Sequence, residues 1–123
     1  MKTLCMFVII AISYNCLALH VLNVNTNMQI TSNSNFDRVI IEADRTLEIM
    51  SGVVFNVYNE TENTDLAGKI VFSNNSILKV HNGASVSVYH TGANYGEIIL
   101  GTAINGTAII QNSGVISTEF LKK

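Results

Sequence analysis

The side chains that could carry metal or acid–base chemistry in this 123-residue chain are few and scattered. The three histidines, His20, His81 and His90, form no HxH or HxxxH pattern and have no carboxylate at metal-ligand spacing. The acidic stretch at 60–65 lacks the glycine framework of an EF-hand or a repeat-type calcium loop. We therefore predict surface histidines, a solvated acidic loop, and neither a metal site nor a cofactor.

Motifs for nucleophilic or acid–base catalysis are also missing from the sequence. The chain contains no G-x-S-x-G and no phosphate-cradling glycine loop, and its cysteines, Cys5 and Cys16, lie near the N-terminus. A glycoside-cleaving enzyme needs two carboxylates that face each other. The outward positions of the repeat described below are Glu48, Lys79 and Ile110, which provide no such pair. We therefore predict a non-enzymatic protein without catalytic residues.

Three Asn-x-Ser/Thr sequons begin at Asn59, Asn74 and Asn105, and all three fall in stretches that resemble turns. Turns lie at the surface and accept an oligosaccharide, so these asparagines are the predicted glycosylation sites of a eukaryotic or viral protein. Alternatively, a chain rich in asparagine, serine and threonine produces such triplets by chance, because asparagine favours turns for its backbone geometry. In a bacterial protein the triplets carry no meaning.

Residues 1–18 have the pattern of a secretory signal peptide. Lys2 supplies a positive charge, an apolar run follows over residues 4–12, and the small residues Cys16 and Ala18 occupy positions −3 and −1 of the expected cleavage site. The apolar run is too short for a membrane anchor, which needs about twenty residues to cross a bilayer. We predict cleavage after Ala18 and a secreted protein, located in the extracellular space or on the cell surface.

The predicted mature region, residues 19–123, is long enough for one all-β repeat domain and contains no cysteine. Its stability must therefore come from packing and backbone hydrogen bonds rather than from disulfides. Loss of Lys2 changes the formal net charge from −2 to −3, and the charges are evenly spread. We accordingly expect no nucleic-acid partner and no stable membrane insertion after cleavage.

The mature region contains a threefold repeat marked by glycines that are 31 residues apart. An aliphatic residue precedes each glycine by five positions, and an aromatic residue follows it by six. Each unit reads as three short strands separated by polar turns. The marker glycines are Gly52, Gly83 and Gly114, and stacking predicts the columns Leu47–Leu78–Ile109, Val53–Ala84–Val115 and Tyr58–Tyr89–Phe120, with Glu48 beside Lys79.

This repeat favours an all-β fold, a short parallel β-solenoid of about three coils. An antiparallel β-sandwich is the alternative, since strand length and turn chemistry do not separate the two folds. The third unit carries Gln111 and Glu119 where the first two carry aliphatic residues, so it is either a polar cap or misaligned. Residues 22–24 lie one period before residues 53–55 and suggest an N-terminal half-unit.

The recurring Leu-x-Ile/Val-x-x-Gly-x-x-hydrophobic pattern over residues 39–120 resembles that of secreted right-handed β-helices. These include bacterial autotransporter passengers and polymorphic membrane-protein adhesins. Residues 72–75 match the FxxN element of the latter, whereas the GGA[ILV] element is absent and residues 82–85 are its nearest approach. The resemblance implies a β-helix that works in adhesion.

We expect a secreted, non-enzymatic β-solenoid module that presents a surface for adhesion, coat formation or recognition, because solenoids expose long faces without a cleft. Its partner would be a protein or glycan surface. One alternative is a structural or truncated fragment of a larger repeat adhesin, which would self-associate through its exposed solenoid ends. Another alternative is a carbohydrate-binding or carbohydrate-active β-helix protein.

Overall fold

The computed structural model describes residues 19–58, 67–89, 96–100 and 107–122, and all regular structure in them is β-strand. The predicted signal peptide, with Ala18, lies outside these residues. Most of the strands are three or four residues long because polar turns interrupt each apolar run. They are β1 (Val21–Val24), β2 (Met28–Ile30), β3 (Ser34–Phe36), β4 (Arg38–Ile41), β5 (Thr46–Ile49), β6 (Val54–Val57), β7 (Lys69–Phe72), β8 (Ser76–Val80), β9 (Ser85–Val88), β10 (Glu97–Ile99), β11 (Ala108–Asn112), β12 (Val115–Thr118) and β13 (Phe120–Lys122).

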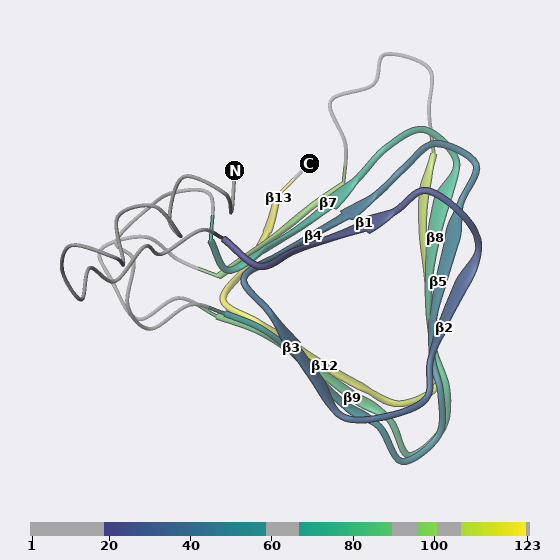
Figure 1. Cartoon of the computed structure of the whole chain (residues 1–123), viewed down its shortest axis with the longest axis vertical. Coiled ribbons are helices and arrows are strands. Elements are labelled where there is room, and N and C mark those ends of the chain that lie inside the picture. Colours follow the sequence, from purple (N-terminus) through teal and green to yellow (C-terminus); the bar gives the residue numbers. More distant parts are fainter. Residues whose placement is uncertain (1–18, 59–66, 90–95, 101–106, 123) are drawn as a thin grey trace, which may run out of the picture.

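The strands form three parallel sheets that make the three sides of a triangle (Figure 1). We call them face A (β1-β4-β7-β10-β13), face B (β2-β5-β8-β11) and face C (β3-β6-β9-β12). Each strand pairs with the strand three places later in the chain, so every third strand adds one coil. The predicted parallel β-solenoid is confirmed. The antiparallel sandwich is wrong for the described residues, because all of their strand pairs are parallel.

The three predicted repeats are the second, third and fourth coils, and a smaller coil made of β1, β2 and β3 precedes them. The predicted half-unit at 22–24 is indeed a strand, but its assignment was wrong. Leu22 pairs with Val39 rather than with Val53. The reason is that the corners of the first coil are shorter than those of the second, so the first coil uses fewer residues than one 31-residue period.

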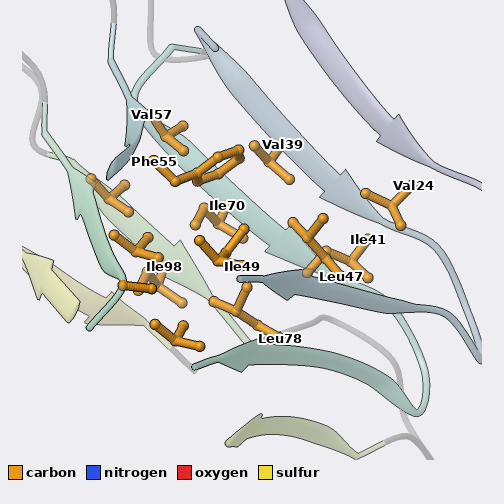
Figure 2. Close-up of a cluster of buried hydrophobic side chains, with 14 of the residues drawn as sticks. Val24, Val39, Ile41, Leu47, Ile49, Phe55, Val57, Ile70, Leu78 and Ile98 are labelled. Carbon is orange, nitrogen blue, oxygen red and sulfur yellow. The ribbon is translucent and has the colours of Figure 1, made fainter. Parts of the chain in front are cut away.

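The core fills the triangle with side chains from alternate positions of strands β1 to β12. Figure 2 shows Leu47, Ile49 and Leu78 pointing into this interior, and all three are fully buried. Burial of one such side chain contributes roughly 1.5–3 kcal/mol to folding. Other enclosed side chains are Val39, Ile41, Phe55, Ile70, Phe72, Val86 and Ile98.

The corner between faces B and C explains two of the repeated glycines. In the second coil the N–H of Val53 donates to the Met50 carbonyl, and in the third coil the corresponding turn is closed at Ala84. Gly52 and Gly83 occupy the third position of these turns with φ of 78° and 81°, a region that glycine enters without steric cost. Their predicted role at a chain bend is confirmed.

The corner between faces A and B uses Asp44 and Asn75 in place of glycine. Their φ values are 60° and 55°, and short polar side chains tolerate this left-handed conformation. The two corners are also bonded to each other: Asn75 Nδ2 donates to Asp44 Oδ1 at 3.2 Å, and the N–H of Asp44 donates to the Asn74 carbonyl at 2.9 Å. Repetition of the same corner therefore keeps the second and third coils in register.

The fourth coil departs from the predicted alignment. Leu47 and Leu78 share a core column as predicted, but its next member is Ile110, whereas Ile109 faces outward and is 37% exposed. Val115 is also outside its predicted column, since it pairs with Ser85 and is 60% exposed. A shift of one residue moves a side chain to the opposite face of a strand.

Two connections of changed length cause these shifts. Partners in β8 and β11 are 32 residues apart because the connection before β11 is longer than the one before β8, and partners in β9 and β12 are 30 residues apart because the following corner is shorter. The third coil passes from Val80 to Ser85 between its strands, whereas the fourth passes from Asn112 directly through two residues to Val115. Gly114 lies in this tight corner, where a side-chain carbon would overlap the Ala84 carbonyl. Glycine is thus needed at position 114 because the backbone of the third coil lies very close. At positions 52 and 83 it is needed because φ is positive.

The third repeat unit, which forms the fourth coil, is both misaligned and partly a polar cap. The alignment slips, so Gln111 lies in an outward column with Lys79 and replaces no core residue. Polar residues nevertheless end two core columns, because Asn112 pairs with Val80 and Thr118 pairs with Val88. The fourth coil is therefore a cap only in part, because Ile110 and Ile116 end the neighbouring core columns on faces B and C.

Candidate functional site

Face C carries a column of short polar side chains on its outer surface. Asn35, Asn56, Ser87 and Ser117 pair in register from the first coil to the fourth. Neighbouring strands in a sheet lie about 4.8 Å apart, so these amide and hydroxyl groups repeat at that spacing along the solenoid axis. The column, which we call the polar ladder, is exposed at both ends and half-buried in the middle.

Two tyrosines lie beside the polar ladder, at the corner where the chain leaves face C. Tyr58 and Tyr89 follow the inward residues Val57 and Val88, so they point outward. Their rings are stacked with centroids 4.4 Å apart and planes 14° from parallel. Such a pair contributes about 0.5–1.5 kcal/mol beyond its buried area. The first two members of the predicted aromatic column are confirmed.

The predicted third member, Phe120, is not in this column. Thr118 pairs with Val88, so the position that follows Tyr89 in the stack belongs to Glu119. Phe120 instead begins β13 on face A, where it pairs with Glu97. The cause is again the slipped register of the fourth coil, followed by a corner of one residue between β12 and β13.

The end of the tyrosine stack leaves an open depression of about 280 Å³. Gly96 positions its rim, because the Gly96 N–H donates to Glu119 Oε2 and its carbonyl accepts a hydrogen bond from Thr118 Oγ1 at 3.3 Å. A side-chain carbon on Gly96 would overlap the Tyr89 backbone, so only glycine allows this approach. The depression is lined by Ser87, Val88, Tyr89, Ser117, Thr118 and Glu119.

The outer surface of face B is organised around one carboxylate. Glu48 Oε2 lies 2.8 Å from His81 Nε2 and 3.7 Å from Lys79 Nζ, so the predicted pairing of Glu48 with Lys79 is confirmed. The hydrogen bond with His81, aided by Lys79 and Gln29, lowers the pKa of Glu48 against the opposing effect of desolvation. The expected outward position of Ile110 was wrong, since Gln111 occupies it.

Face A presents an ion pair in which Lys69 Nζ and Glu97 Oε2 are 2.8 Å apart, with both side chains less than one fifth exposed. The two residues are partners in the register of β7 and β10. Each of these two carboxylates, Glu48 and Glu97, is thus held by a cation on its own face. The pairs stabilise neighbouring coils, although each such contact contributes little where water screens it.

The structure places only some of the residues that the sequence analysis singled out. Asn74 is exposed in the turn between faces A and B, while the hydroxyl of Ser76 in the same sequon is buried and donates to the Ser73 carbonyl at 2.8 Å. His20 is exposed and its ring lies 4.7 Å from that of Phe36. Asn59, Asn105, His90 and the acidic stretch 60–65 lie outside the described residues, and glycosylation stays a prediction.

Within the described ranges, no three histidine, cysteine or acidic side chains gather closely enough to hold a metal ion. A search of the same residues finds no helix with the length and apolarity needed to cross a membrane.

Sequence reasoning missed most of the polar ladder and the whole depression. Asn56 and Ser87 lie one 31-residue period apart, so half of the ladder was readable from the repeat. Asn35 and Ser117 were hidden because the first and fourth coils do not follow that period. The depression forms because Glu119, rather than a third aromatic residue, follows Tyr58 and Tyr89 in their column. The sequence does not show this, because it depends on the register of the fourth coil.

No protein-family model, curated protein or solved structure matches this chain. The resemblance to autotransporter passengers and polymorphic membrane-protein adhesins therefore stays a prediction.

Proposed function

We propose that this protein is a secreted, non-enzymatic recognition module that uses face C to bind a protein or glycan surface in adhesion or coat formation. The observation that carries the proposal is the polar ladder with the stacked pair Tyr58 and Tyr89 at its side. Tyrosine, serine and asparagine are enriched in the binding loops of antibodies. They offer contact area and adaptable hydrogen bonds at low entropic cost.

Face C is a better candidate than the other two faces because its outward groups are short and uncharged. On faces A and B the charged outward groups are already engaged in the Lys69–Glu97 and Glu48–His81 contacts, and the remaining central outward column of face A is apolar. A partner that covered those groups would have to desolvate charges, which costs binding free energy unless new partners replace the water. Covering amides and hydroxyls costs less.

The proposal of a non-enzymatic protein is supported by the separation of the described carboxylates. Glu48 lies on face B and Glu97 lies on face A, each in an ion pair, so these two cannot flank one glycosidic bond. Glu119 lies at the rim of the depression and has no second carboxylate among the lining residues. The geometry favours binding over cleavage.

The competing proposal, a fragment of a larger repeat adhesin, is supported by the apolar residues that end core columns, Ile110, Ile116 and Leu121. Leu121 ends a core column on face A, where it pairs with Ile98, and is 60% exposed. Asn112 and Thr118 weigh against it, since polar residues at the ends of core columns discourage another coil from stacking. Light scattering of the purified chain separates the two: monomers support the module, and concentration-dependent fibres support the fragment.

The experiment that tests the module compares matched lysine substitutions on two faces. We would measure capture of the full chain on a panel of immobilised extracellular-matrix proteins and an array of glycans. N56K and S87K on face C should each reduce the strongest binding signal at least tenfold. Q29K and Q111K add the same charge at outward positions of face B and should leave binding unchanged.

Circular dichroism would show that all four variants keep their strand content. Equal loss of binding by the face B and face C variants, or no loss by either, would contradict the proposal. Failure of the unmodified chain to bind any member of the panel would also count against it.

A further inference from the structure

We propose that the depression at the end of the tyrosine stack is a binding site for one ring of a neutral saccharide. This inference rests on the proposed function and names the ligand class that face C would recognise. It is carried by the residues lining the depression, which combine an aromatic wall, hydroxyl groups from two neighbouring coils and one carboxylate.

The aromatic wall is Tyr89, which the stack with Tyr58 holds in a fixed orientation. The C–H groups on one face of a sugar ring carry a small positive charge, and the face of an aromatic ring is negative, so the two pack favourably. Because the stack and the β9 backbone fix the ring in advance, little side-chain entropy is lost on binding. This gives the site an apolar surface of the kind that sugars require.

The polar side of the depression supplies groups that match sugar hydroxyls. Ser87 and Ser117 lie opposite each other on neighbouring strands, and each hydroxyl both donates and accepts hydrogen bonds. Glu119 is held in place because its Oε2 accepts the Gly96 N–H. A carboxylate has about four acceptor positions, so Glu119 retains capacity to accept charge-assisted hydrogen bonds from a ligand hydroxyl.

The volume and charge of the depression restrict its ligand further. About 280 Å³ is at the lower limit of small-molecule sites, which typically occupy roughly 300–1,000 Å³, so a single ring is the expected occupant. No lysine or arginine is among the lining residues, and Glu119 is negative. Phosphates, sulfated sugars and uronic acids are therefore disfavoured, which leaves a neutral saccharide.

A quaternary ammonium group is the competing ligand, because a tyrosine next to a carboxylate also attracts cations. Such a group has no hydroxyls and would leave Ser87 and Ser117 without a role. A saccharide uses them, and further rings of an oligosaccharide would lie along the polar ladder toward Asn56 and Asn35. The ladder would thus provide additional hydrogen bonds to an oligosaccharide bound on this face.

Isothermal titration calorimetry tests the inference with defined probes. The full chain would be titrated with the neutral tetrasaccharides cellotetraose, maltotetraose, mannotetraose and chitotetraose, and separately with tetragalacturonic acid and tetramethylammonium. At least one neutral tetrasaccharide should bind, while the acidic tetramer and the cation should not. Binding of only the acidic tetramer or the cation, or of no probe at all, would overturn the inference.

Three variants locate the binding. Y89A should weaken the tightest neutral complex at least tenfold and S117V about threefold, whereas T46V, which removes an outward hydroxyl on face B, should leave it unchanged. S117V guards against misfolding of Y89A, since valine suits a strand position. Unchanged affinity in both Y89A and S117V would place the saccharide elsewhere and refute the site.

The outcome also separates this inference from the proposed function. If no saccharide binds but N56K and S87K still abolish capture by the protein panel, the saccharide site fails and recognition through face C stands. If saccharides bind but no face C variant affects them, and N56K and S87K also leave capture on the panel unchanged, both proposals fail.

Discussion

The two central coils and the fourth coil are built from similar sequence but differ in how their corners are made. In the second and third coils, the corners between faces A and B and between faces B and C repeat with positive-φ residues in register, Asp44 with Asn75 and Gly52 with Gly83. In the fourth coil the corner between faces B and C is shorter, and Gly114 occupies the position that stacks on Ala84. The comparison teaches that corner length, more than strand composition, decides which side chains face the core and which form a surface.

The largest expected difference lies in the core column that crosses both regions. Leu78 is fully buried between coils, whereas Ile110 is half-buried in the last coil of face B. We expect L78A to lower the free energy of unfolding by about 2–5 kcal/mol, and I110A to lower it by less than half of that. Urea denaturation followed by circular dichroism measures both. Equal losses would mean that the fourth coil is packed as tightly as the third.

The second prediction separates the two kinds of glycine. G83N should cost less than about 1 kcal/mol, because asparagine tolerates positive φ, as Asn75 does at the other corner, and a side-chain carbon there makes only ordinary contacts. G114N should cost about 1–3 kcal/mol, because its side chain would collide with the Ala84 carbonyl.

Thermal unfolding of the two glycine variants, with G83V as a control that cannot accept positive φ, checks this order. A larger loss for G83N than for G114N would show that the corner assignment in the fourth coil is wrong.

The third prediction concerns the pH dependence of the Glu48 contacts on face B. The pKa of Glu48 is lowered in the folded protein from an ordinary value of 4.5, so its stabilising contribution is present above that pH and disappears as the pH falls through the lowered pKa. E48Q should therefore be less stable than the wild type by up to about 1 kcal/mol at pH 7. The difference should shrink toward pH 3.

Urea midpoints at pH 7, 5 and 3 measure this difference, with E42Q as a control because Glu42 is exposed. A gap between E48Q and the wild type that stays constant with pH would contradict the role of the Glu48 charge.

The smallest expected effect comes from extending the face B contacts into the fourth coil. Gln111 is the partner of Lys79 in the sheet register, so Q111E would place a carboxylate opposite its ammonium group. We expect a gain of a few tenths of a kcal/mol that 0.5 M salt removes. A destabilised Q111E variant would indicate that the register of β11 is not the one described.

The fold could be predicted from the sequence where the coils repeat, and it escaped prediction where they do not. The Gly52 and Gly83 corners share one period, so the Leu47–Leu78 column and the Tyr58–Tyr89 stack followed directly. Gly114 looked equivalent because its neighbours are also apolar, although its corner is shorter. Sequence spacing alone does not reveal whether a glycine serves positive φ or close approach.

The first coil was predicted only as a half-unit at 22–24, because its shorter corners depart from the 31-residue period and are completed by asparagine side chains. Asn27 Oδ1 accepts the Thr46 N–H at 3.0 Å, and Asn33 Oδ1 accepts the Val54 N–H at 2.8 Å. In these corners, side-chain oxygens accept hydrogen bonds from the N–H groups of the second coil. A longer corner would offer backbone carbonyl oxygens for the same purpose. The polar ladder could be predicted only in part, because its end residues lie in the first and fourth coils, which do not follow the 31-residue period.

The most direct test of the central claim, that face C is the recognition surface, is to map the bound partner on the chain by NMR. Amide resonances would be assigned and then followed during titration with the strongest binder from the panel. If face C binds the partner, the largest shifts will fall on Asn56, Ser87 and Ser117, with little change at Lys79 on face B or Val71 on face A. Shifts confined to face A, to face B or to the end strands would contradict it.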